Sequence, residues 1–415
     1  MRLYMVGGAV RDKLLGREPK DRDYVAVGMT PDDVLRLFPE AQLVGKSFPV
    51  YLVPGLGEVA LARVERATGL GHADFAVRFD PTVTLEEDLA RRDLTINAMA
   101  LPHDPATGAT AGLDELVDPH GGRRDLAAGL LRHVSEAFDE DALRVHRVAR
   151  FAAQYDFTVA KETIERMRGI ERSRLEALSG ERVGCEFRRA MAAPHPARFV
   201  EVLHEAGQLG VHFPELAALA DVPAGPPLHH NEGDSLTHTL MVVREARRLG
   251  GGELEVTAAL LHDLGKGTSP REEWPSHRLH ESRGVPLVEG LCERLRLPTE
   301  VRAAAVLTCA EHLRVHRFLE MGHGKQVDLV LRADATAIRA EGLALVAEAD
   351  ARGRAVERPH VEGAAALRSA ALVARSIHYR DLKVPPALKG REIGLFIRRA
   401  RAQAVGRALR EGGSQ

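Results

Sequence analysis

Several residue classes are scarce in this 415-residue chain, and each scarcity narrows what the protein can be. Its three cysteines, Cys185, Cys292 and Cys309, have neither metal-ligand nor disulfide spacing, which fits a reducing compartment. Aromatic residues make up only 4% of the chain, so nucleic-acid binding cannot rest mainly on base stacking. No apolar run is long enough for a signal peptide or a membrane span. The sequence therefore predicts a cytoplasmic protein that contacts no membrane.

Charge of one sign is also lacking, because 57 Lys and Arg nearly balance 59 Asp and Glu. This excludes a globally basic nucleic-acid binder and leaves only local basic patches. A hydrophobic content of 45% supports well-packed cores, and the length predicts two to four domains. Strand and helix signals alternate up to residue 134 and are almost wholly helical afterwards, which indicates an α+β fold. We expect domains at 1–134, 135–222, 223–352 and 353–415, with a Pro-rich linker at 221–227 and a basic C-terminal tail.

The most informative stretch is Gly-Gly-Ala-Val-Arg-Asp at residues 7–12, followed by Asp-Arg-Asp at 21–23. The pattern predicts a strand at 3–6, a helix after the glycines, and a second strand at 24–27. Asp21 and Asp23 would project from one side of that strand, and paired carboxylates suit divalent metals such as Mg²⁺. Gly8 lets backbone N–H groups approach phosphates, and Arg11 adds a bidentate contact. Taken in this order, the motifs indicate a nucleotidyltransferase palm with two metals and a triphosphate.

A second charged stretch, Arg-Arg-Asp-Leu-Thr-Ile-Asn at residues 91–97, follows a cluster of acids. Arginines such as Arg92 suit triphosphate oxygens, and Asp93 or Asn97 can bond ribose hydroxyls. The alternative for this stretch is a solvated run of charges at a helix start.

A third stretch, residues 140–150, reads as a helix on which Asp141, Arg144, Arg147 and Arg150 form one face. Cytosine and adenine each pair an exocyclic amino donor with a ring-nitrogen acceptor. Asp141 can accept from the amino group and Arg144 can donate to the ring nitrogen, which would select C and A together. Arg147 and Arg150 would then serve phosphates or an RNA end. The alternative is a solvated stripe of ion pairs.

The region between residues 229 and 323 holds nine of the 19 histidines. His238 begins one helical pattern, and the pair His262-Asp263 ends another, directly before Leu-Gly-Lys. Nitrogen and oxygen ligands without thiolate favour Mn²⁺, Ni²⁺, Co²⁺ or Mg²⁺ over a structural zinc. The pair predicts a metal-dependent phosphohydrolase in which a metal activates water and Lys266 holds phosphate. Further candidate ligands in the same region are His277, His280, Glu311 and His312.

In this order, GGAVRD, DRD, RRDLTIN and EDALRVHRVARF resemble a class II tRNA CCA-adding enzyme, and the resemblance covers nearly the whole chain. It is closest to the bacterial multifunctional form with a C-terminal HD domain. The resemblance implies a nucleotidyltransferase head with a polymerase beta-like palm, then an all-α neck, body and HD-domain tail. A flexible loop would lie at residues 67–81. It implies metal binding by Asp21 and Asp23, and the closing HD ligand would be Asp350. It also implies nucleotide contacts and base selection by Gly8, Arg11, Arg92, Asp141, Arg144, Arg147 and Arg150.

The function that the resemblance implies is template-independent addition and repair of the 3′-CCA of tRNA from CTP and ATP. The head would use Mg²⁺, and the HD domain would act as a phosphatase and 2′,3′-cyclic phosphodiesterase with Ni²⁺, Mn²⁺, Co²⁺ or Mg²⁺. An enzyme adding only A or only CC, or a poly(A) polymerase, is the first alternative. A nucleotide-signalling hydrolase with a sensor head is the second, and a non-catalytic RNA scaffold is the third. The oligomeric state and the tRNA footprint stay open.

Overall fold

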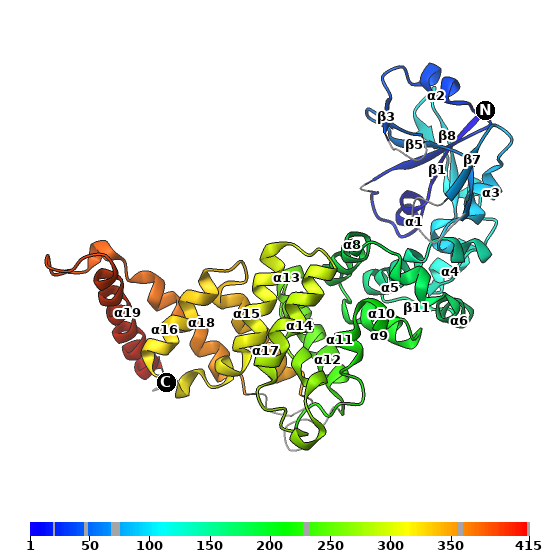
Figure 1. Ribbon diagram of the computed structural model, residues 1–415. Helices are drawn as coiled ribbons and strands as arrows, with labels where there is room; N and C mark the ends of the chain where they lie inside the picture. The colour runs from blue at the N-terminus through cyan, green and yellow to red at the C-terminus, as the bar shows by residue number, and fades with distance from the viewer. Residues whose placement is uncertain (20, 45–48, 68–74, 227–232, 355–359, 413–415) are drawn as a thin grey trace. The chain divides into compact units, whose positions relative to one another are not determined.

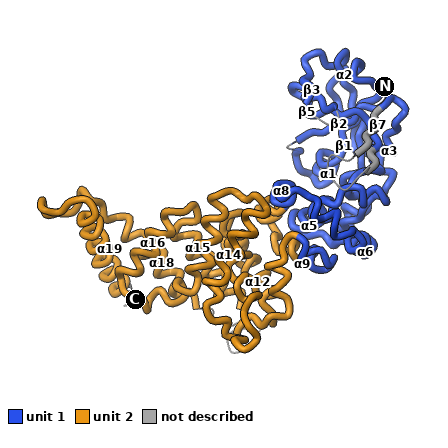
Figure 2. Tube along the Cα trace, viewed as in Figure 1, with its two compact units in different colours: residues 1–186, 201–211 blue, residues 187–200, 212–415 orange. Residues whose placement is uncertain are grey.

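The computed structural model describes residues 1–415 apart from 20, 45–48, 68–74, 227–232, 355–359 and 413–415. The chain forms two compact units, coloured separately in Figure 2. Unit 1 is Met1–Glu186 with Glu201–Val211, and unit 2 is Phe187–Val200 with His212–Gln415. The four predicted domains stay a prediction of a finer division. Residues 68–74 of the predicted flexible loop lie outside the described residues.

Unit 1 begins with a strand-rich part (Figure 1). Its elements are β1 (Arg2–Val6), α1 (Gly8–Leu14), β2 (Asp23–Val27), α2 (Pro31–Leu37), β3 (Gln42–Val44), β4 (Val50–Val53), β5 (Gly57–Leu61), β6 (Arg63–Ala67), β7 (Phe75–Phe79), α3 (Leu85–Ala90), η1 (Thr95–Asn97), β8 (Ala100–Asp104), β9 (Ala109–Thr110), η2 (Leu113–Glu115), α4 (Gly122–Ala127) and β10 (Leu130–Leu131). The strands predicted at 3–6 and 24–27 and the helix between them are confirmed.

Seven of these strands form one mixed sheet in the order β3-β4-β5-β2-β1-β8-β9. Within it β2 and β5 run parallel, and β1 pairs antiparallel with both β2 and β8. The apolar run at residues 3–6 is buried throughout, as expected of a central strand covered on both faces. One core cluster joins the sheet to α3 through Tyr4, Val6, Val25, Leu85 and Leu89. This core holds the start of β2 and the turn before α1 in place.

The rest of unit 1 is mainly helical. Its elements are η3 (Glu136–Glu140), α5 (Leu143–Tyr155), β11 (Thr158–Val159), α6 (Lys161–Gly169), α7 (Arg172–Glu176), α8 (Gly180–Met191), α9 (Ala197–Glu205) and α10 (Leu209–His212). The last three of these helices each have residues in both units. The short strand β11 pairs in parallel with β10 and is an exception to the predicted helical run. The α+β fold class, with a polymerase-like head and a helical remainder, is confirmed.

Unit 2 is built from helices in its described part (Figure 1). They are α11 (Pro214–Ala217), α12 (Ser235–Arg248), α13 (Glu253–Leu261), η4 (Leu264–Thr268), η5 (Arg271–Glu273), α14 (His280–Arg294), α15 (Thr299–His316), η6 (Phe318–Glu320), α16 (His323–Asp334), α17 (Arg339–Arg352), α18 (Glu362–Ser376), η7 (Tyr379–Asp381) and α19 (Arg391–Gly412). None of the helices in the described part of the chain has the length and apolar character needed to cross a bilayer.

The predicted linker at 221–227 is wrong for its described part, because residues 221–226 belong to unit 2 and pack within it. Val222 and Ala224 are buried, and Pro223 forms an isolated β-bridge with Asp234. Ser235 Oγ donates a hydrogen bond to the Pro223 carbonyl at 3.0 Å. The Pro and Gly content predicted irregular backbone correctly, but it did not reveal that this backbone seats α12.

Candidate active sites

Three carboxylates lie together where β2 begins. Asp23 opens β2, while Asp21 lies in an exposed bend before it. Glu58 is the register partner of Asp23 on β5, so the two side chains point to the same face of the sheet. The pKa of the Asp23 carboxyl is raised first by loss of hydration to the surrounding protein atoms, although the residue as a whole is exposed, and then by the neighbouring carboxylate of Glu58. Crowded carboxylates of this kind gain most from a divalent cation.

The prediction that Asp21 and Asp23 share one strand face is therefore wrong in detail, because the strand starts only at Asp23. The sequence interpretation also missed Glu58. Its partnership with Asp23 depends on a parallel pairing between strands far apart in the chain. The available signal was an acid inside the apolar strand at 57–61.

The glycine turn brings an arginine beside this acidic corner. Gly7 is the N-cap of α1 with φ +67, a conformation that favours glycine. A Cβ atom at Gly7 would lie 2.9 Å from Nη1 of Arg92. Gly8 is the first residue of α1. The turn therefore leaves room for the Arg92 guanidinium next to the backbone at the start of the helix.

The predicted phosphate-binding arginines of the head are held in fixed positions. Arg11 Nη1 donates to Asn97 Oδ1 at 2.6 Å. Arg92 Nη2 pairs with Oδ2 of the buried Asp88 at 3.1 Å, and Arg91 pairs with the other oxygen at 2.7 Å. Both contacts use carboxylates or amides that are buried or nearly so. The arginines are thus oriented by the protein itself before any phosphate arrives.

Asp93 has an internal role rather than a role at the surface. It is buried, and Oδ1 accepts from the Leu94 N–H at 2.8 Å and from Asn97 Nδ2 at 3.0 Å. Oδ2 accepts from Arg147 Nε at 2.8 Å. The alternative interpretation of residues 91–97 as a solvated run of charges is therefore wrong for Asp93, which is buried. Its oxygens are taken by protein donors, so the expected ribose contact has no support from this geometry.

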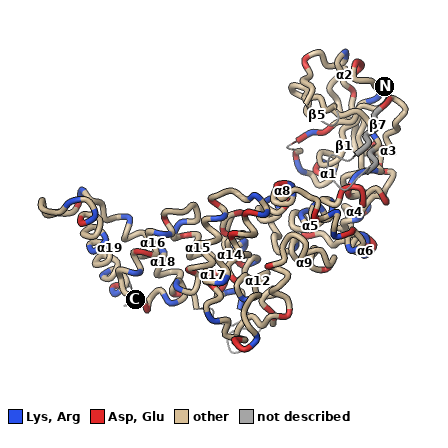
Figure 3. Tube along the Cα trace, in the orientation of Figure 1, with Lys and Arg blue, Asp and Glu red and all other residues tan. Residues whose placement is uncertain are grey.

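The charge of Asp93 is stabilised by α5. Burial alone would raise the pKa of Asp93, but the Arg147 guanidinium outweighs it and holds this pKa well below its usual range. In turn, the Asp93 carboxylate raises the pKa of Arg147. Arg150 Nε pairs with Glu186 Oε2 at 2.5 Å, and Figure 3 shows basic and acidic residues interspersed around α5 and α8. Arg147 and Arg150 of α5 are therefore ionised and oriented.

The predicted base-selecting face is not continuous, because α5 begins at Leu143 and Asp141 lies before it in extended backbone. Asp141 Oδ1 accepts from the Leu143 N–H at 3.0 Å, and Oδ2 pairs with Arg182 at 2.9 Å. Arg144 is buried and donates to the backbone carbonyls of Ala137 and Arg91. The prediction of one helical face for residues 141 to 150 is wrong. A base-selecting role for Asp141 and Arg144 stays a prediction.

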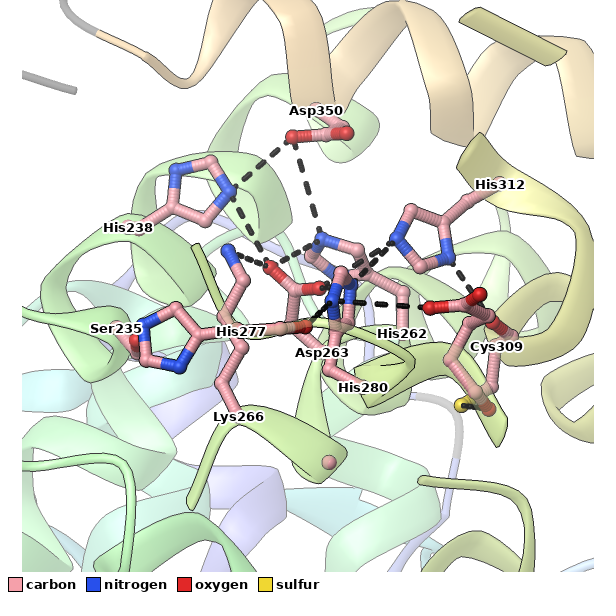
Figure 4. A network of polar contacts seen from close by, with 12 residues as sticks. Ser235, His238, His262, Asp263, Lys266, His277, His280, Cys309, His312 and Asp350 are labelled. Carbon is pink, nitrogen blue, oxygen red and sulfur yellow. Dashed lines mark hydrogen bonds and ion pairs between the residues drawn. The ribbon is translucent and has the colours of Figure 1, made fainter. Parts of the chain in front are cut away.

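Unit 2 brings together the four predicted HD residues (Figure 4). His238 comes from α12, His262 and Asp263 lie between α13 and η4, and Asp350 lies on α17. Nε2 of His238 lies 3.1 Å from Asp350 Oδ1 and 3.7 Å from Asp263 Oδ2. Nε2 of His262 lies 3.2 Å from the same Asp263 oxygen. All four side chains are buried.

The further candidates divide into two groups. His280 and His312 face Asp263, with Nε2–Oδ1 distances of 3.0 Å and 3.5 Å. His277 instead lies 2.7 Å from the Pro223 carbonyl through Nε2. Glu311 pairs with Arg314 and Arg332, away from the histidines. The structure therefore supports His280 and His312 as parts of the site and gives His277 and Glu311 other partners.

Lys266 lies beside a carboxylate of the candidate site. Its Nζ pairs with Asp263 Oδ2 at 2.6 Å and donates to the Ala224 carbonyl at 2.7 Å. Burial opposes ionisation of Asp263, but the neighbouring His262 and Lys266 keep its pKa well below its usual range. Lys266 thus holds a carboxylate of the site in this structure, and its proposed phosphate contact stays a prediction.

Two residues at Asp350 were missed by the sequence interpretation. His316 Nε2 lies 2.5 Å from Asp350 Oδ2, and Arg354 Nη2 lies 2.8 Å from the same oxygen. His316 follows His312 by one helical turn, and Arg354 follows Asp350 by one turn. That i, i+4 spacing was the available signal. Arg354 Nε also donates to the other oxygen of Asp350, Oδ1, at 3.3 Å, and His238 Nε2 lies 3.1 Å from that oxygen.

The chemistry of this donor set fits a divalent metal. Nδ1 of His262 lies 2.7 Å from the Ala259 carbonyl, which can only accept, so Nδ1 carries the proton. In the neutral form of this ring the lone pair on Nε2 faces the carboxylate of Asp263. A metal ion between the two would be bound by both, and a second-shell bond from Nδ1 to a carbonyl is typical of metal-binding histidines. His238, His262, Asp263 and Asp350 are the residues that would hold the ion.

Comparisons with known proteins find a family match for the head and another for the histidine-rich region. The poly A polymerase head domain matches residues 3–132, a probable RNA and SrmB-binding site of polymerase A matches 156–219, and the HD domain matches 235–352. Fold and site together define an HD-containing nucleotidyltransferase. Multifunctional CCA proteins of Alkalilimnicola ehrlichii and Stenotrophomonas maltophilia are 45% and 46% identical to this chain. The alignment with the first protein covers 99% of this chain and 98% of that protein. The alignment with the second covers 98% of this chain and 100% of that protein. The chain belongs to the family of multifunctional CCA proteins, which confirms the predicted family.

Solved structures agree on the fold. The Thermotoga maritima CCA-adding enzyme complexed with tRNA has a TM-score of 0.60 at 18% identity and covers 98% of this chain and 87% of its own. A CCA-adding enzyme in complex with ATP has a TM-score of 0.63 at 19% identity, over 97% of this chain and 86% of its own. Nucleotidyltransferase and HD families both use divalent metals.

Proposed function

We propose that this chain adds and repairs the 3′-terminal CCA of tRNA from CTP and ATP, without a nucleic-acid template. The observation that carries the proposal is the acidic corner at β2, flanked by oriented arginines, in a member of the multifunctional CCA family. Asp21 and Asp23 would hold Mg²⁺, which assists the 3′-hydroxyl and the leaving pyrophosphate during in-line attack on the α-phosphate. The cytoplasm, with its tRNA, would be the place of action.

Arginines supply the remaining charge complementarity in this proposal. Arg11 and Arg92 lie by the glycine turn and would contact the triphosphate. Arg147 and Arg150 would contact the nucleotide or the RNA end from α5. Because Asp93 and Glu186 already orient both α5 side chains, little conformational entropy is lost when an anionic ligand binds. Asp141 and Arg144 would choose C and A.

A labelled tRNA transcript that lacks CCA tests this function. With CTP and ATP together, the transcript should lengthen by three residues, and an Asp23→Ala protein should leave it unchanged. Transcripts lacking all of CCA and transcripts lacking only A, each given one nucleoside triphosphate, separate the alternatives. Addition of A alone or of CC alone would indicate a partial enzyme, and a long A tail would indicate a poly(A) polymerase. No addition at all would revive the sensor-head and scaffold alternatives.

We also propose that the HD domain hydrolyses phosphate monoesters and 2′,3′-cyclic phosphates, as at damaged RNA ends. The convergence of His238, His262, Asp263 and Asp350 in one buried cluster supports this. Ni²⁺, Mn²⁺, Co²⁺ or Mg²⁺ would activate water there. Release of phosphate from 2′,3′-cyclic nucleotides, measured with each metal in turn, tests the proposal. Equal activity in a His262→Ala, Asp263→Ala protein would contradict it.

A further inference from the structure

The guanidinium group of Arg11 lies over two aromatic rings of α5. Its Cζ atom lies 5.4 Å from the centre of the Phe151 ring and 5.2 Å from the centre of the Tyr155 ring. The two rings are one helical turn apart and nearly parallel, with 6.2 Å between their centres and 9° between their planes. Both distances to Arg11 are within the range of cation–π attraction, about 6 Å. An arginine of α1 is therefore held against the C-terminal half of α5.

We propose that Phe151 and Tyr155 are positioning residues for nucleotide addition. Their ring faces hold the Arg11 guanidinium where it meets the triphosphate, and they join this arginine of the head to α5. The inference rests on the nucleotide-addition function proposed for the chain.

Hydrogen bonds and rings share the work of orienting Arg11. Nη1 donates to Asn97 Oδ1 at 2.6 Å, while Nε and Nη2 donate to Asp12 Oδ1 at 3.1 Å and 3.0 Å. A guanidinium has five N–H donors, so two are left after these three bonds to described residues. Two donors are what a bidentate phosphate contact requires. A ring face attracts the guanidinium without adding a negative charge, whereas a further carboxylate would repel the triphosphate.

The same two rings serve other arginines. Cζ of Arg147 and Cζ of Arg150 lie 5.7 Å and 3.9 Å from the centre of the Phe151 ring, and Cζ of Arg17 lies 5.6 Å from that of Tyr155. The negative face of an aromatic ring reduces the repulsion among such cations. Three carboxylates pair with the four arginines, so this group keeps one positive charge in excess for an anionic ligand. The carboxylates are Asp12, Asp93 and Glu186.

The alternative is that the rings only fill space within unit 1. Phe151 is buried and Tyr155 is half-buried, and Tyr155 also contacts Phe157 with 5.4 Å between ring centres. Packing alone tolerates another apolar side chain of similar size, such as leucine. A cation–π contact does not, because leucine has no ring face. The two interpretations therefore predict different properties for Tyr155→Leu.

The kinetics of CMP and AMP addition to tRNA lacking part of CCA test the proposal. Tyr155→Leu should raise the KM for CTP and for ATP by the same factor, about tenfold, as expected for a cation–π contact that water does not reach. The factor is shared because Arg11 faces the phosphates, and the rejection of UTP should not change. A contact made equally in the ground and transition states affects KM, so kcat should change less than about twofold.

Two further variants separate the ring face from its volume. Tyr155→Phe keeps the face and should have the KM of the parent protein. Phe157→Leu is the matched control, since Phe157 packs on Tyr155 and no arginine of the described residues lies over its ring. It should also keep the KM of the parent. An unchanged KM in both Tyr155→Leu and Phe151→Leu would overturn the proposal, as would an equal rise in Phe157→Leu.

A double-mutant cycle shows whether Tyr155 acts through Arg11. Binding is measured by calorimetry without tRNA, using a CTP analogue whose phosphates are joined by methylene groups that resist cleavage. Tyr155→Leu should weaken binding about tenfold in the parent and less than about twofold in an Arg11→Gln protein. Equal weakening in both backgrounds would overturn the proposal. A parent that shows the expected coupling but adds no nucleotide would reject the addition function and leave the positioning of Arg11 standing.

Discussion

At the scale of single residues, one series of contacts joins the arginines of the glycine turn and of α5. Arg147 donates to Asp93, Asp93 accepts from Asn97 at 3.0 Å, and Asn97 accepts from Arg11 at 2.6 Å. Each group holds the next in one orientation, and Asp93, Asn97 and Arg11 are buried. Asp93 thus positions two arginines that the proposed nucleotide addition uses, although it need not touch the nucleotide.

Replacing Asp93 by alanine breaks this series of contacts and should lower the stability of the protein. The ionised Arg147 would lose its nearest partner and keep only Glu186 at 3.9 Å, so the free energy of unfolding should fall by about 3 kcal/mol, as for other broken buried pairs. Urea denaturation measures this change. Asp93→Asn keeps the volume and part of the hydrogen bonding, so it should cost less. Equal stability of parent and Asp93→Ala would contradict the assigned role.

The same pair makes stability depend on pH. Arg147 lowers the pKa of Asp93 below its unfolded value of about 3.9, so the contribution is complete above about pH 4. It is lost as the pH falls toward the folded pKa. The difference in unfolding free energy between parent and Asp93→Asn should therefore shrink below pH 4. A difference that stays constant down to acid unfolding would speak against an ionised Asp93.

Base choice is also a property of single residues. If Asp141 accepts from the amino group of C or A, Asp141→Ala should cost roughly 1–3 kcal/mol of discrimination and let UTP and GTP compete. Competition among the four nucleoside triphosphates on a tRNA lacking CCA measures this. Arg182→Ala is the matched control, because it removes only the partner of Asp141 and should leave the choice intact. Unchanged rejection of UTP by Asp141→Ala would place base choice elsewhere.

At the scale of elements, the packing of η4 against α14 decides whether Asp263 meets His280. Gly265→Ala places a methyl group against the His280 carbonyl and should separate the two elements. We expect loss of cyclic-phosphate hydrolysis with little change in nucleotide addition. Gly290→Ala on α14 is the control, since nothing lies within 4 Å of its Cβ position, and hydrolysis should stay normal. Normal hydrolysis by Gly265→Ala would mean that this packing is not needed.

At this scale the sequence predicted features that have short-range patterns. It did not predict contacts that depend on pairing or packing between elements far apart in the chain. The strand, glycine turn and helix at 3–14 and the residue pair His262-Asp263 have short-range signatures, and they were predicted. Glu58 reaches Asp23 only through the pairing of β2 with β5. Asp141 was placed on a helix by its spacing, but η3 ends before it and α5 starts after it. His316 gained its partner only when α15 and α17 packed together.

At the scale of the whole molecule, the two proposed chemistries belong to different compact units. The acidic corner lies in unit 1, and the histidine cluster lies in unit 2. Asp23→Ala should therefore abolish CMP and AMP incorporation and leave phosphate release unchanged. His262→Ala with Asp263→Ala should do the reverse. Parallel assays of both activities on each protein measure this, and loss of both activities in either protein would show that the sites do not act separately.

The central claim is that one chain both repairs an RNA end and rebuilds its CCA. A tRNA lacking CCA and ending in a 2′,3′-cyclic phosphate tests this most directly, because no 3′-hydroxyl is available until the phosphate is removed. Incubated with the protein, CTP, ATP and divalent metal, it should lengthen by three residues, C, C and A. The same tRNA should stay unextended with the His262→Ala, Asp263→Ala protein. Extension of the 3′-hydroxyl form combined with no extension of the cyclic-phosphate form by the parent protein would contradict the account.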